Sequence, residues 1–491
     1  MMNIVMVTSE AVPYAKTGGL GDVAGTLATQ LSEHGHEVSL VLPFYRAIKE
    51  NLSRWHLKEL PGSLSVPMGD RTLSARVWVE ERSPILKAYF IEFNQFYDRP
   101  ALYGENGKAY EDNGRRFSFL SKATLELLIK LKIAPDILHV NDWQASLVPY
   151  YLKTWFWSHA LFKRTASVLT IHNMGYQGQT PMADSAFIGL NWMQVRSDEF
   201  EDHGGVNLLK GGIFYADMIT TVSPTYAKEV VSEPGGCGLS SYLHRRGSDI
   251  IGILNGIDEE EWNSETDPYL PARYSADDLS GKNICKQSLQ ERFQLIRNPD
   301  IPVFGMVGRM AYQKGLQLVM ECAESILSWE LQLVVLGSGE SIYTEFFKDL
   351  AGKHPQKVGV EIGFNQSLAH LIEAGSDFFI MPSLYEPCGL NQIYSMLYGT
   401  LPIVRRTGGL ADTVLNFDEK TEKGTGFVFN DISAEALKNT IGWALSTWYD
   451  NYRAYQSLQQ QAMRQQFGWH LAVEKYSEVY KKALERRLHW S

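Results

Sequence analysis

Two glycine-rich segments contain the residue types of an anion-binding site. The first is the run Lys-Thr-Gly-Gly-Leu-Gly-Asp at 16–22, and the second is Thr-Gly-Gly-Leu-Ala-Asp at 407–412. Where such a segment opens onto a helix, its unpaired backbone amides and the positive end of the helix dipole favour an anion. Lys16 adds a cation, although an isolated lysine beside a turn is more often a plain surface residue. We therefore expect each segment to contribute to one phosphate-binding site.

A second group of cations lies in the run Gly-Arg-Met-Ala-Tyr-Gln-Lys-Gly at 308–315. Arg309 stands at the expected end of a strand and Lys314 at the expected start of the next helix. Two cations at a helix N-terminus suit a diphosphate leaving group, because the arginine fork binds oxygen atoms in pairs. A solvated basic turn is the alternative. Gly337 and Gly339, after the following strand, indicate either a close backbone approach or a tight turn.

Acidic, imidazole and indole side chains at other strand ends are suited to binding a polyol. Glu386 follows an apolar run and precedes a helix-like stretch, where it either bonds sugar hydroxyls or acts as a helix-cap partner. Asp142 and His172 also stand at predicted strand ends, and both can hydrogen-bond hydroxyl groups. Trp143 offers an apolar face for a sugar ring or packs beneath it.

The residue patterns exclude several other chemistries. No two aspartates are separated by one residue, so an Asp-x-Asp clamp for a metal-bound nucleotide is missing, and no His-Glu-x-x-His zinc motif occurs. The run Glu-His-Gly-His-Glu at 33–37 reads as a helix end, not as a metal site. The dinucleotide pattern GxGxxA at 19–24 begins about ten residues beyond the strand, and the second strand ends in Leu42 and Pro43 instead of an acid. We therefore predict no metal and no nicotinamide cofactor.

Alternating apolar and amphipathic segments must position these side chains. The segments at 3–8, 20–32 and 38–42 read as strand, helix and strand, which is the opening of a doubly wound parallel sheet. Ligands of such α/β sheets bind outside the carboxyl ends of the strands, where the polar residues stand. Further strands are predicted at 136–141, 167–173, 218–223 and 250–255, and a second series at 302–308, 331–336, 378–382 and 401–405.

The second series restarts the architecture of the first, so we predict two domains. The first spans 1–257 and the second 258–465. The segment at 258–281 is polar and holds two prolines, which favours a linker containing the hinge. The tail at 466–491 reads as a helix that crosses back to the first domain, although its aromatic residues equally suit a cap on the second.

Composition limits the classes of function. The 491 residues are 44% hydrophobic and 21% charged, with a net charge of −10 and a pI near 5.7. This balance does not suit binding to duplex nucleic acid or an anionic membrane, and the apolar runs are far shorter than a membrane span. The four cysteines form no CxxC pair, so we expect reduced thiols. The first ten residues do not read as an export signal, so we expect a cytoplasmic protein.

These motifs resemble those of the bacterial glycogen synthase and plant starch synthase family of glycosyltransferases over essentially the whole chain. Residues 16–20 are similar to the family's Lys-Thr-Gly-Gly-Leu signature, and residues 309–315 to its arginine and Gln-Lys-Gly phosphate motif. Residues 385–390 resemble its Glu-Pro-Cys-Gly-Leu motif, and residues 405–412 its second glycine loop. The resemblance implies an α/β protein of the GT-B fold, with two Rossmann-like doubly wound domains facing each other across a deep cleft.

The resemblance also implies an activity. This is the retaining transfer of glucose from ADP-glucose to the non-reducing 4-hydroxyl end of an α-1,4-glucan, with release of ADP and without a cofactor. The alternatives are a glucan phosphorylase-like enzyme, which needs a lysine-bound pyridoxal phosphate, and a glucan-binding scaffold. The residues leave open the choice between ADP-glucose and UDP-glucose, the oligomeric state, and whether the product is glycogen or starch-like.

Carried over by position, the resemblance assigns roles to individual residues. Catalysis would involve Glu386, His172, Asp142, Arg309 and Lys314. Acceptor contacts would come from Tyr97, Asp142 and Trp143. Tyr394 replaces the second acid of the Glu-x7-Glu motif found in broader retaining GT-B enzymes, which bears on the ribose contacts. The nucleotide-sugar would be bound by Lys16, Gly18, Gly19, Asp22, Asn255, Arg309, Lys314, Gly337, Gly339, Glu386, Cys388, Gly389, Leu390, Tyr394, Thr407, Gly408 and Gly409.

Overall fold

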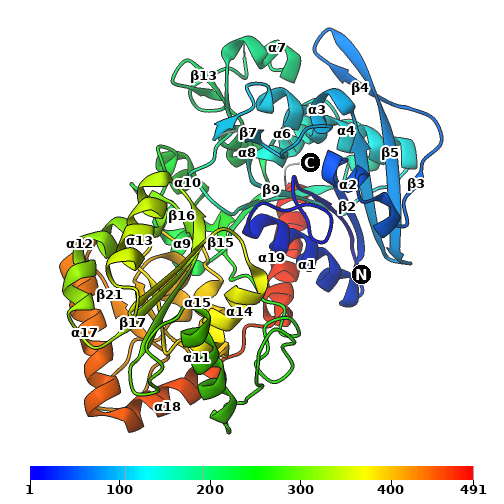
Figure 1. Ribbon diagram of the computed structural model, residues 1–491. Helices are drawn as coiled ribbons and strands as arrows, with labels where there is room; N and C mark the ends of the chain where they lie inside the picture. Colours follow the sequence, from blue (N-terminus) through cyan, green and yellow to red (C-terminus); the bar gives the residue numbers. More distant parts are fainter. Residues whose placement is uncertain (106, 192, 490–491) are drawn as a thin grey trace. The chain divides into compact units, whose positions relative to one another are not determined.

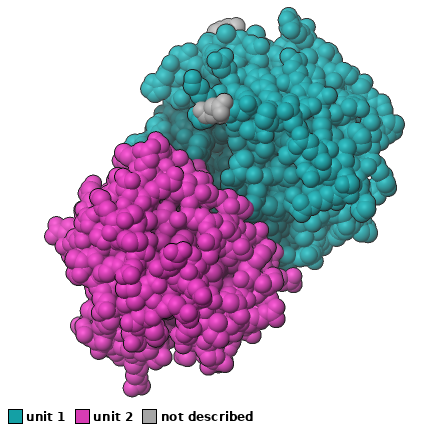
Figure 2. Space-filling view, viewed as in Figure 1, with its two compact units in different colours: residues 1–256, 469–491 teal, residues 257–468 magenta. Residues whose placement is uncertain are grey.

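The computed structural model describes residues 1–105, 107–191 and 193–489, and the chain divides into two compact units (Figures 1 and 2). Unit 1 contains residues 1–256 and 469–491, and unit 2 contains residues 257–468. The chain therefore passes between the units twice. The domain boundaries expected from the sequence, after residues 257 and 465, fall close to these two crossings.

Unit 1 is built on a mostly parallel sheet with the strand order β15-β14-β10-β9-β1-β2-β6-β5-β3, and β4 pairs with β5 beyond this path. All neighbours from β15 to β6 are parallel. The order reverses between β1 and β9, and the crevice at such a reversal is where doubly wound sheets bind ligands. The strands are β1 (Asn3–Val7), β2 (Glu37–Pro43), β3 (Lys58–Glu59), β4 (Leu64–Met68), β5 (Arg71–Ser83), β6 (Leu86–Glu92), β9 (Ile137–Asn141), β10 (Ala166–Ile171), β14 (Met218–Thr221) and β15 (Ile250–Gly252).

The helices of unit 1 connect these strands and cover the sheet. In α1 the buried residues Leu20, Val23, Leu27 and Leu31 recur every three or four positions, so one face of the helix packs inward. The helices are α1 (Gly19–Glu33), α2 (Arg46–Lys49), α3 (Asn94–Tyr97), α4 (Asn113–Leu131), α5 (Asp142–Ala145), α6 (Leu147–Thr154), α7 (Ser185–Ile188), α8 (Leu208–Tyr215), α9 (Pro224–Glu229), α10 (Ser240–Arg246) and α19 (Trp469–His489). Short strands β7 (Gly104–Glu105) and β8 (Lys108–Ala109) form a hairpin, and β11 (Gln179–Thr180), β12 (Glu201–Asp202) and β13 (Gly205–Asn207) form a small sheet.

Unit 2 contains a fully parallel sheet with the order β18-β17-β16-β19-β20-β21. Numbered from its own first strand this order is 3-2-1-4-5-6, which is the Rossmann arrangement, and it reverses between β16 and β19. The strands are β16 (Val303–Met310), β17 (Gln332–Gly339), β18 (Val358–Ile362), β19 (Phe378–Met381), β20 (Leu401–Arg405) and β21 (Phe427–Phe429). The helices are α11 (Ser280–Arg292), α12 (Leu316–Leu327), α13 (Ser341–Lys353), α14 (Gln366–Gly375), α15 (Asn391–Leu397), α16 (Gly408–Thr413), α17 (Ala434–Asp450) and α18 (Tyr452–Met463).

Alternate side chains of β17 show how helices cover both faces of the unit 2 sheet. Leu333 and Val335 join the buried cluster that includes α12 and α17, whereas Val334 and Leu336 join the cluster that includes α11 and α14. A strand buried on both faces has no polar alternation, because both sets of side chains pack against helices. This explains why the strands of unit 2 appear in the sequence as continuous apolar runs.

The segment at 258–281 is not the linker that its polar composition predicts. Asp267 is fully buried, and its carboxylate accepts hydrogen bonds from the ring of His370 at 2.7 Å and from the hydroxyl of Tyr398 at 2.6 Å. Tyr274 is also buried and donates its hydroxyl to the backbone carbonyl of Tyr398 at 2.8 Å. The prediction is wrong because the polar groups of this segment find their partners inside unit 2.

The C-terminal helices divide between the two units. Helices α17 and α18 pack on unit 2, whereas α19 packs against α1 and β10 of unit 1. The hydroxyl of Tyr480 in α19 lies 2.8 Å from Nδ1 of His139 in β9, and the other ring nitrogen of His139 lies 2.6 Å from the hydroxyl of Thr170 in β10. This buried chain of polar groups fixes α19 to the centre of the unit 1 sheet.

Candidate functional site

In unit 1 the predicted site residues other than Tyr97, which ends α3 after β6, follow the carboxyl ends of β1, β9, β10 and β15. The first glycine segment follows β1 and leads into α1, and Asp142 follows β9 directly. These two strands flank the reversal of strand order in unit 1. His172 and Asn255 follow β10 and β15. The fold therefore gathers the unit 1 residues at one edge of one sheet.

The first glycine segment presents open backbone. A Cβ atom added to Gly18 or to Gly19 would meet no atom within 4 Å, so there is space in front of both residues. Gly21 differs, because its Cβ would lie 2.5 Å from Cβ of Lys16. The ammonium of Lys16 forms an ion pair with Asp22 at 2.8 Å, and both side chains are solvent-exposed. Asp22 is thus the partner of the predicted phosphate-binding lysine.

Glu10 was not among the predicted residues, yet its buried side chain accepts hydrogen bonds from this segment. It is 3% exposed, and its carboxylate accepts the backbone N–H groups of Thr17 and Gly18. It also accepts the hydroxyl of Thr17 at 2.8 Å and the phenol of Tyr103. The signal available in the sequence was weak, namely a carboxylate just beyond the end of the first strand.

Asp142 and His172 form the second part of the unit 1 site. Asp142 accepts the backbone N–H groups of His172, at 2.7 Å, and of Asn173, but burial raises its pKa to about 7. Its backbone has a φ of +53°, a left-handed conformation that few residues other than glycine adopt. Nε2 of His172 lies 3.0 Å from the side-chain oxygen of Asn141, and burial lowers the pKa of this imidazole to about 3. At neutral pH the site therefore combines a neutral imidazole with a carboxyl group near its titration midpoint.

The other predicted residues of unit 1 are mostly enclosed by protein. Tyr97 is fully buried and donates its hydroxyl to the backbone carbonyl of Arg116 at 2.8 Å, so this placement does not support an acceptor contact. Trp143 is buried and packs edge-on against Phe117. This agrees with the second of its two expected roles, in which it packs beneath the sugar instead of facing it. Asn255 is buried too, but its side-chain oxygen has no hydrogen-bond partner among the described residues. A buried acceptor without a partner is unusual and suits a ligand hydroxyl.

In unit 2 Lys314 meets Glu386 at the reversal between β16 and β19. Arg309 is exposed near the end of β16, and Lys314 closes the short helical turn Tyr312–Lys314 that follows. Nζ of Lys314 lies 2.6 Å from Oε2 of the buried Glu386, which also accepts the hydroxyl of Ser383 at 2.9 Å. The ammonium and the carboxylate are thus brought together by the two strands at which the sheet order reverses.

Gly337 and Gly339 lie within a strand and not in a loop or turn after it, and their contact with the nucleotide-sugar stays a prediction. Both belong to β17, where Gly337 pairs with Gly308 and Gly339 with Met310 of β16. A Cβ on Gly337 would lie 2.1 Å from the carbonyl oxygen of Gly308, and one on Gly339 would lie 2.2 Å from that of Met310. The close approach expected from these glycines is therefore made to the neighbouring strand.

The second glycine segment packs against the loop that carries Glu386. Thr407 is the buried residue that precedes α16, and the backbone N–H of Gly409 donates to the carbonyl of Glu386 at 3.0 Å. A Cβ on Gly408 would lie 1.9 Å from the carbonyl oxygen of Glu386, and one on Gly409 would lie 1.9 Å from that of Cys388. These glycines permit two stretches of backbone to touch.

The residues after Glu386 continue this packing. Gly389 has a φ of +69°, and the side-chain amide of Gln392 donates to the backbone carbonyls of Cys388 and Gly389 at 3.1 Å each. Leu390 is half-buried and precedes α15. Tyr394 on α15 stacks on the ring of Trp262 with 3.8 Å between the centroids. The predicted set thus divides between two units, and the binding of one ligand by both parts stays a prediction.

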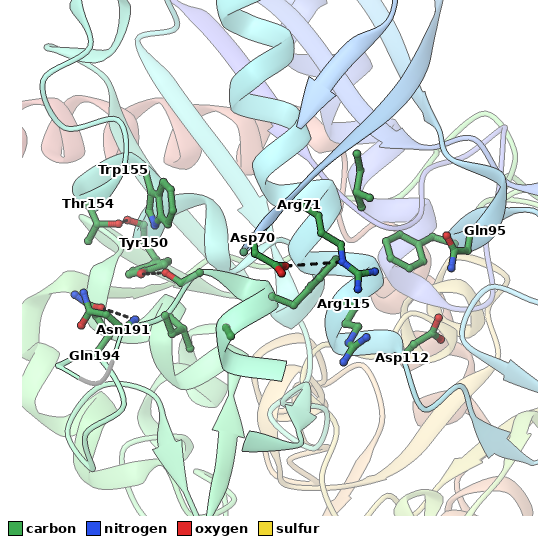
Figure 3. Close-up of a pocket in the computed structure, with 17 residues that line it drawn as sticks. Asp70, Arg71, Gln95, Asp112, Arg115, Tyr150, Thr154, Trp155, Asn191 and Gln194 are labelled. Carbon is green, nitrogen blue, oxygen red and sulfur yellow. Dashed lines mark hydrogen bonds and ion pairs between the residues drawn. The ribbon is translucent and has the colours of Figure 1, made fainter. Parts of the chain in front are cut away.

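A large open cavity of about 1190 Å³ lies elsewhere in unit 1 and shares no residue with the predicted site (Figure 3). Its lining includes Asp70, Arg71, Asp112, Arg115 and the half-exposed indole of Trp155. The charged groups are already paired within the protein, since Arg115 contacts Asp184 at 2.6 Å and Asp112 contacts Arg99 at 2.5 Å. Arg71 and Asp70 form a looser pair at 3.8 Å. An ionic ligand such as a diphosphate is therefore not expected in this cavity.

Three further findings concern metal-binding groups, membrane-spanning helices and the cysteines. Within residues 1–105, 107–191 and 193–489, no group of three or more His, Cys, Asp or Glu side chains is arranged to hold a metal ion. In the same residues no helix is both long and apolar enough to cross a bilayer. All four cysteines are free thiols, as the sequence predicts.

Comparison with known proteins gives consistent matches. The family model of the starch synthase catalytic domain matches residues 3–245, and that of glycosyl transferases group 1 matches residues 287–464. Glycogen synthase 1 of Geobacter sulfurreducens is 45% identical over 490 residues, which cover 99% of this chain and 97% of that protein. Glycogen synthase of Treponema denticola is 43% identical over 493 residues, or 99% of each chain.

Solved structures agree with these matches. The catalytic domain of starch synthase IV from Arabidopsis thaliana, bound to ADP and acarbose, has a TM-score of 0.90 and 33% identity over 99% of both chains. Sucrose-phosphate synthase from Thermosynechococcus elongatus has a TM-score of 0.59 and 17% identity over 99% of this chain and all of that one, and it shares the fold alone. The predicted GT-B fold class is thus confirmed. The chain belongs to the glycogen and starch synthase family of glycosyltransferases, and it is a glucosyltransferase of glycogen synthesis with a nucleotide-sugar donor and a glucan acceptor.

Proposed function

We propose that this enzyme transfers glucose from ADP-glucose, with retention of configuration, to the non-reducing 4-hydroxyl end of an α-1,4-glucan and releases ADP. The observation that carries the proposal is the contact between Lys314 and Glu386 at the reversal of the unit 2 sheet, with Arg309 on the preceding strand. A cation suited to phosphate and a carboxylate suited to sugar hydroxyls stand side by side, as a sugar diphosphate requires. ADP as the nucleotide is supported by the similar starch synthase IV of Arabidopsis thaliana, whose catalytic domain binds ADP in its solved structure.

The leaving group is stabilised by cations in this proposal. As the bond from C1 to the diphosphate breaks, negative charge develops on the phosphate oxygens, and Arg309 and Lys314 offset it. Donors that are already aimed at a developing charge are usually the largest single contribution to catalysis. In the free enzyme Lys314 is held by Glu386 and therefore needs little reorganisation when the diphosphate arrives.

Glu386, Asp142 and His172 bind hydroxyl groups in this proposal. Glu386 accepts from the transferred glucose, and Asn255 offers its unpartnered oxygen to the same sugar. The neutral imidazole of His172 donates or accepts a hydrogen bond without adding charge near the sugar. Asp142 lies near donor and acceptor. We propose front-face attack, in which the acceptor hydroxyl passes its proton to a phosphate oxygen as the new glycosidic bond forms.

We further propose that the reaction needs no metal ion and no prosthetic group, because lysine and arginine neutralise the diphosphate. Turnover in EDTA equal to turnover in added Mg²⁺ is the expected result. Loss of turnover in EDTA that Mg²⁺ restores would contradict this part of the proposal. A phosphorylase-like activity would instead show the absorbance of a lysine-bound pyridoxal phosphate in the purified protein.

The main test measures release of ADP when the purified chain is mixed with ADP-glucose and glycogen, with UDP-glucose in parallel. We expect ADP release that depends on glycogen, and a lower kcat/KM with UDP-glucose. An anomeric assay of the new linkage by NMR checks retention. Binding of glycogen without nucleotide release would identify a scaffold and contradict the proposal, whereas preference for UDP-glucose would overturn only the choice of nucleotide.

A further inference from the structure

The carboxylate of Glu10 occupies the inner side of the first glycine segment. It accepts the N–H groups of Thr17 and Gly18, the hydroxyl of Thr17 and the phenol of Tyr103. No lysine, arginine or histidine among the described residues forms an ion pair with it. Four hydrogen bonds therefore stabilise this buried charge in place of a cation.

This arrangement divides the backbone amides of the segment into two groups. The amides of Thr17 and Gly18 already bind Glu10 and are directed inward. The amides of Gly19 and Leu20 belong to the first turn of α1, where N–H groups have no partner within the helix. The space in front of Gly18 and Gly19 is open, whereas Glu10 itself is almost inaccessible to solvent. An anion approaching from outside therefore meets the helix start and Lys16, with the carboxylate behind the loop.

Tyr103 connects Glu10 to a second segment. Its phenol donates to Glu10, and its backbone carbonyl accepts the side-chain amide of Asn113 at the start of α4 at 2.8 Å. Residues 93 positions apart in the chain, Glu10 and Tyr103, are thus joined by one hydrogen bond. The shape of the first glycine segment is fixed from the core of unit 1.

We propose that Glu10 is a positioning residue that holds the first glycine segment in the conformation that receives the donor's diphosphate. The identity of the ligand rests on the function proposed above, whereas the positioning itself does not. The opposite reading is that Glu10 occupies an anion site and competes with the diphosphate. The two readings predict opposite changes in nucleotide affinity, so one substitution separates them.

The test uses Glu10→Gln in the full chain, because glutamine keeps the shape but removes the charge. Hydrogen bonds to a charged group are stronger than those to a neutral one. We therefore expect the equilibrium constant for local opening of the loop to rise roughly fivefold. Hydrogen exchange followed by mass spectrometry, without nucleotide, is expected to show about fivefold faster exchange in the peptide that contains Thr17 and Gly18. Calorimetric titration with ADP is expected to give a Kd about fivefold higher, and ADP-glucose KM is expected to rise while glycogen KM stays unchanged.

Two further variants keep the result interpretable. Thr17→Ala removes only the hydroxyl bond to Glu10, so we expect a change in the same direction but smaller, even if Glu10→Gln folds poorly. Glu92→Gln removes another buried carboxylate of unit 1, one that binds Trp78, Arg76 and Lys49. It is expected to lower stability without altering exchange at residues 17–18 or the affinity for ADP.

Each outcome decides between the readings. Tighter binding of ADP by Glu10→Gln would overturn the proposal, because it would identify Glu10 as a competitor. Unchanged exchange and unchanged affinity in both Glu10→Gln and Thr17→Ala would also overturn it. Faster exchange in a protein whose native form binds no ADP would support the positioning role and contradict the proposed donor instead.

Discussion

The two glycine segments, 16–22 and 407–412, share a sequence pattern but differ in what their glycines face. In the first, Gly18 and Gly19 look onto open space, and the inner amides bind the carboxylate of Glu10. In the second, Gly408 and Gly409 touch the backbone of the loop at 386–388, and the amide of Gly409 binds a carbonyl of that loop. The first segment therefore has room for a ligand, whereas the second supports the loop that carries Glu386.

This difference shows that one motif can serve two physical purposes. In both segments two glycines stand where a helix starts, but only the surroundings decide whether the missing Cβ leaves space for a ligand or for another loop. Phosphate binding by both segments stays a prediction, and of the two the first alone has open space in front of its glycines. In unit 2 the proposed chemistry rests on the ion pair of Lys314 and Glu386, and Gly408 and Gly409 pack against the loop that carries Glu386.

The largest expected effect comes from Lys314, which forms an ion pair with Glu386 of the loop that the second segment supports. Lys314→Ala is expected to lower kcat by about 10² to 10³, because a donor aimed at the leaving group is lost. Steady-state assays with ADP-glucose and glycogen measure this change. Lys353→Ala is the matched control, since Lys353 is 68% exposed and makes only a 4.0 Å contact with Glu324. Near-normal turnover of Lys314→Ala would contradict the catalytic role proposed for Lys314.

A direct comparison of the two segments uses the same substitution in each. Gly409→Ala is expected to destabilise the protein by about 1–3 kcal/mol, because its Cβ would overlap the carbonyl of Cys388. Gly19→Ala is expected to change stability by less than about 0.5 kcal/mol, because its Cβ meets nothing. Urea unfolding measures both. In activity assays Gly19→Ala should raise the KM for ADP-glucose, since the methyl group would enter the ligand space. Equal destabilisation by the two changes would contradict the difference between an open first segment and a closely packed second one.

Substitution of Asp142 tests whether burial of this carboxyl group in unit 1 lowers the stability of the folded protein. Its pKa is raised to about 7 by burial, so between pH 4 and pH 7 the folded state holds a proton that the unfolded state has lost. Stability from this group is therefore lost as pH rises through that window. Asp142→Asn removes the cost, and its gain in unfolding free energy is expected to be roughly 2–3 kcal/mol larger at pH 8 than at pH 5. Calorimetry at both pH values measures the gain, and glucosyl transfer should fall. An equal gain at both pH values would contradict a buried, titrating Asp142.

The sequence predicted those parts of the site that depend on local pattern. Apolar runs that end in polar residues located the strand ends of Asp142, His172 and Arg309 correctly, because a parallel strand buried on both faces has that composition. Glu10 escaped notice because its partners Thr17 and Tyr103 are set by the tertiary fold.

Two expectations that the structure does not support have the same origin. Tyr97 lies in the core although the family resemblance implies an acceptor contact for it, and the segment at 258–281 is packed although its composition suits a linker. A motif or a composition does not reveal which polar groups find a partner inside the protein. The buried carboxylate of Asp267, which binds His370 and Tyr398, is such a case.

The smallest effect is expected from Asp22, and it sharpens the account of the first segment. Asp22 lies in the first turn of α1 and pairs with Lys16, and both side chains are largely exposed. An exposed ion pair and a favourable helix-dipole contact together contribute about 0.5–1 kcal/mol, so Asp22→Asn should lower the unfolding free energy by no more than that. Without its partner, Lys16 is free to turn toward a diphosphate, and the Kd for ADP is expected to fall by less than about threefold at low salt. Titration calorimetry at low and high salt measures this. A large rise in Kd would mean that Asp22 contacts the nucleotide itself, and the role of the first segment would then extend beyond its amides and Lys16.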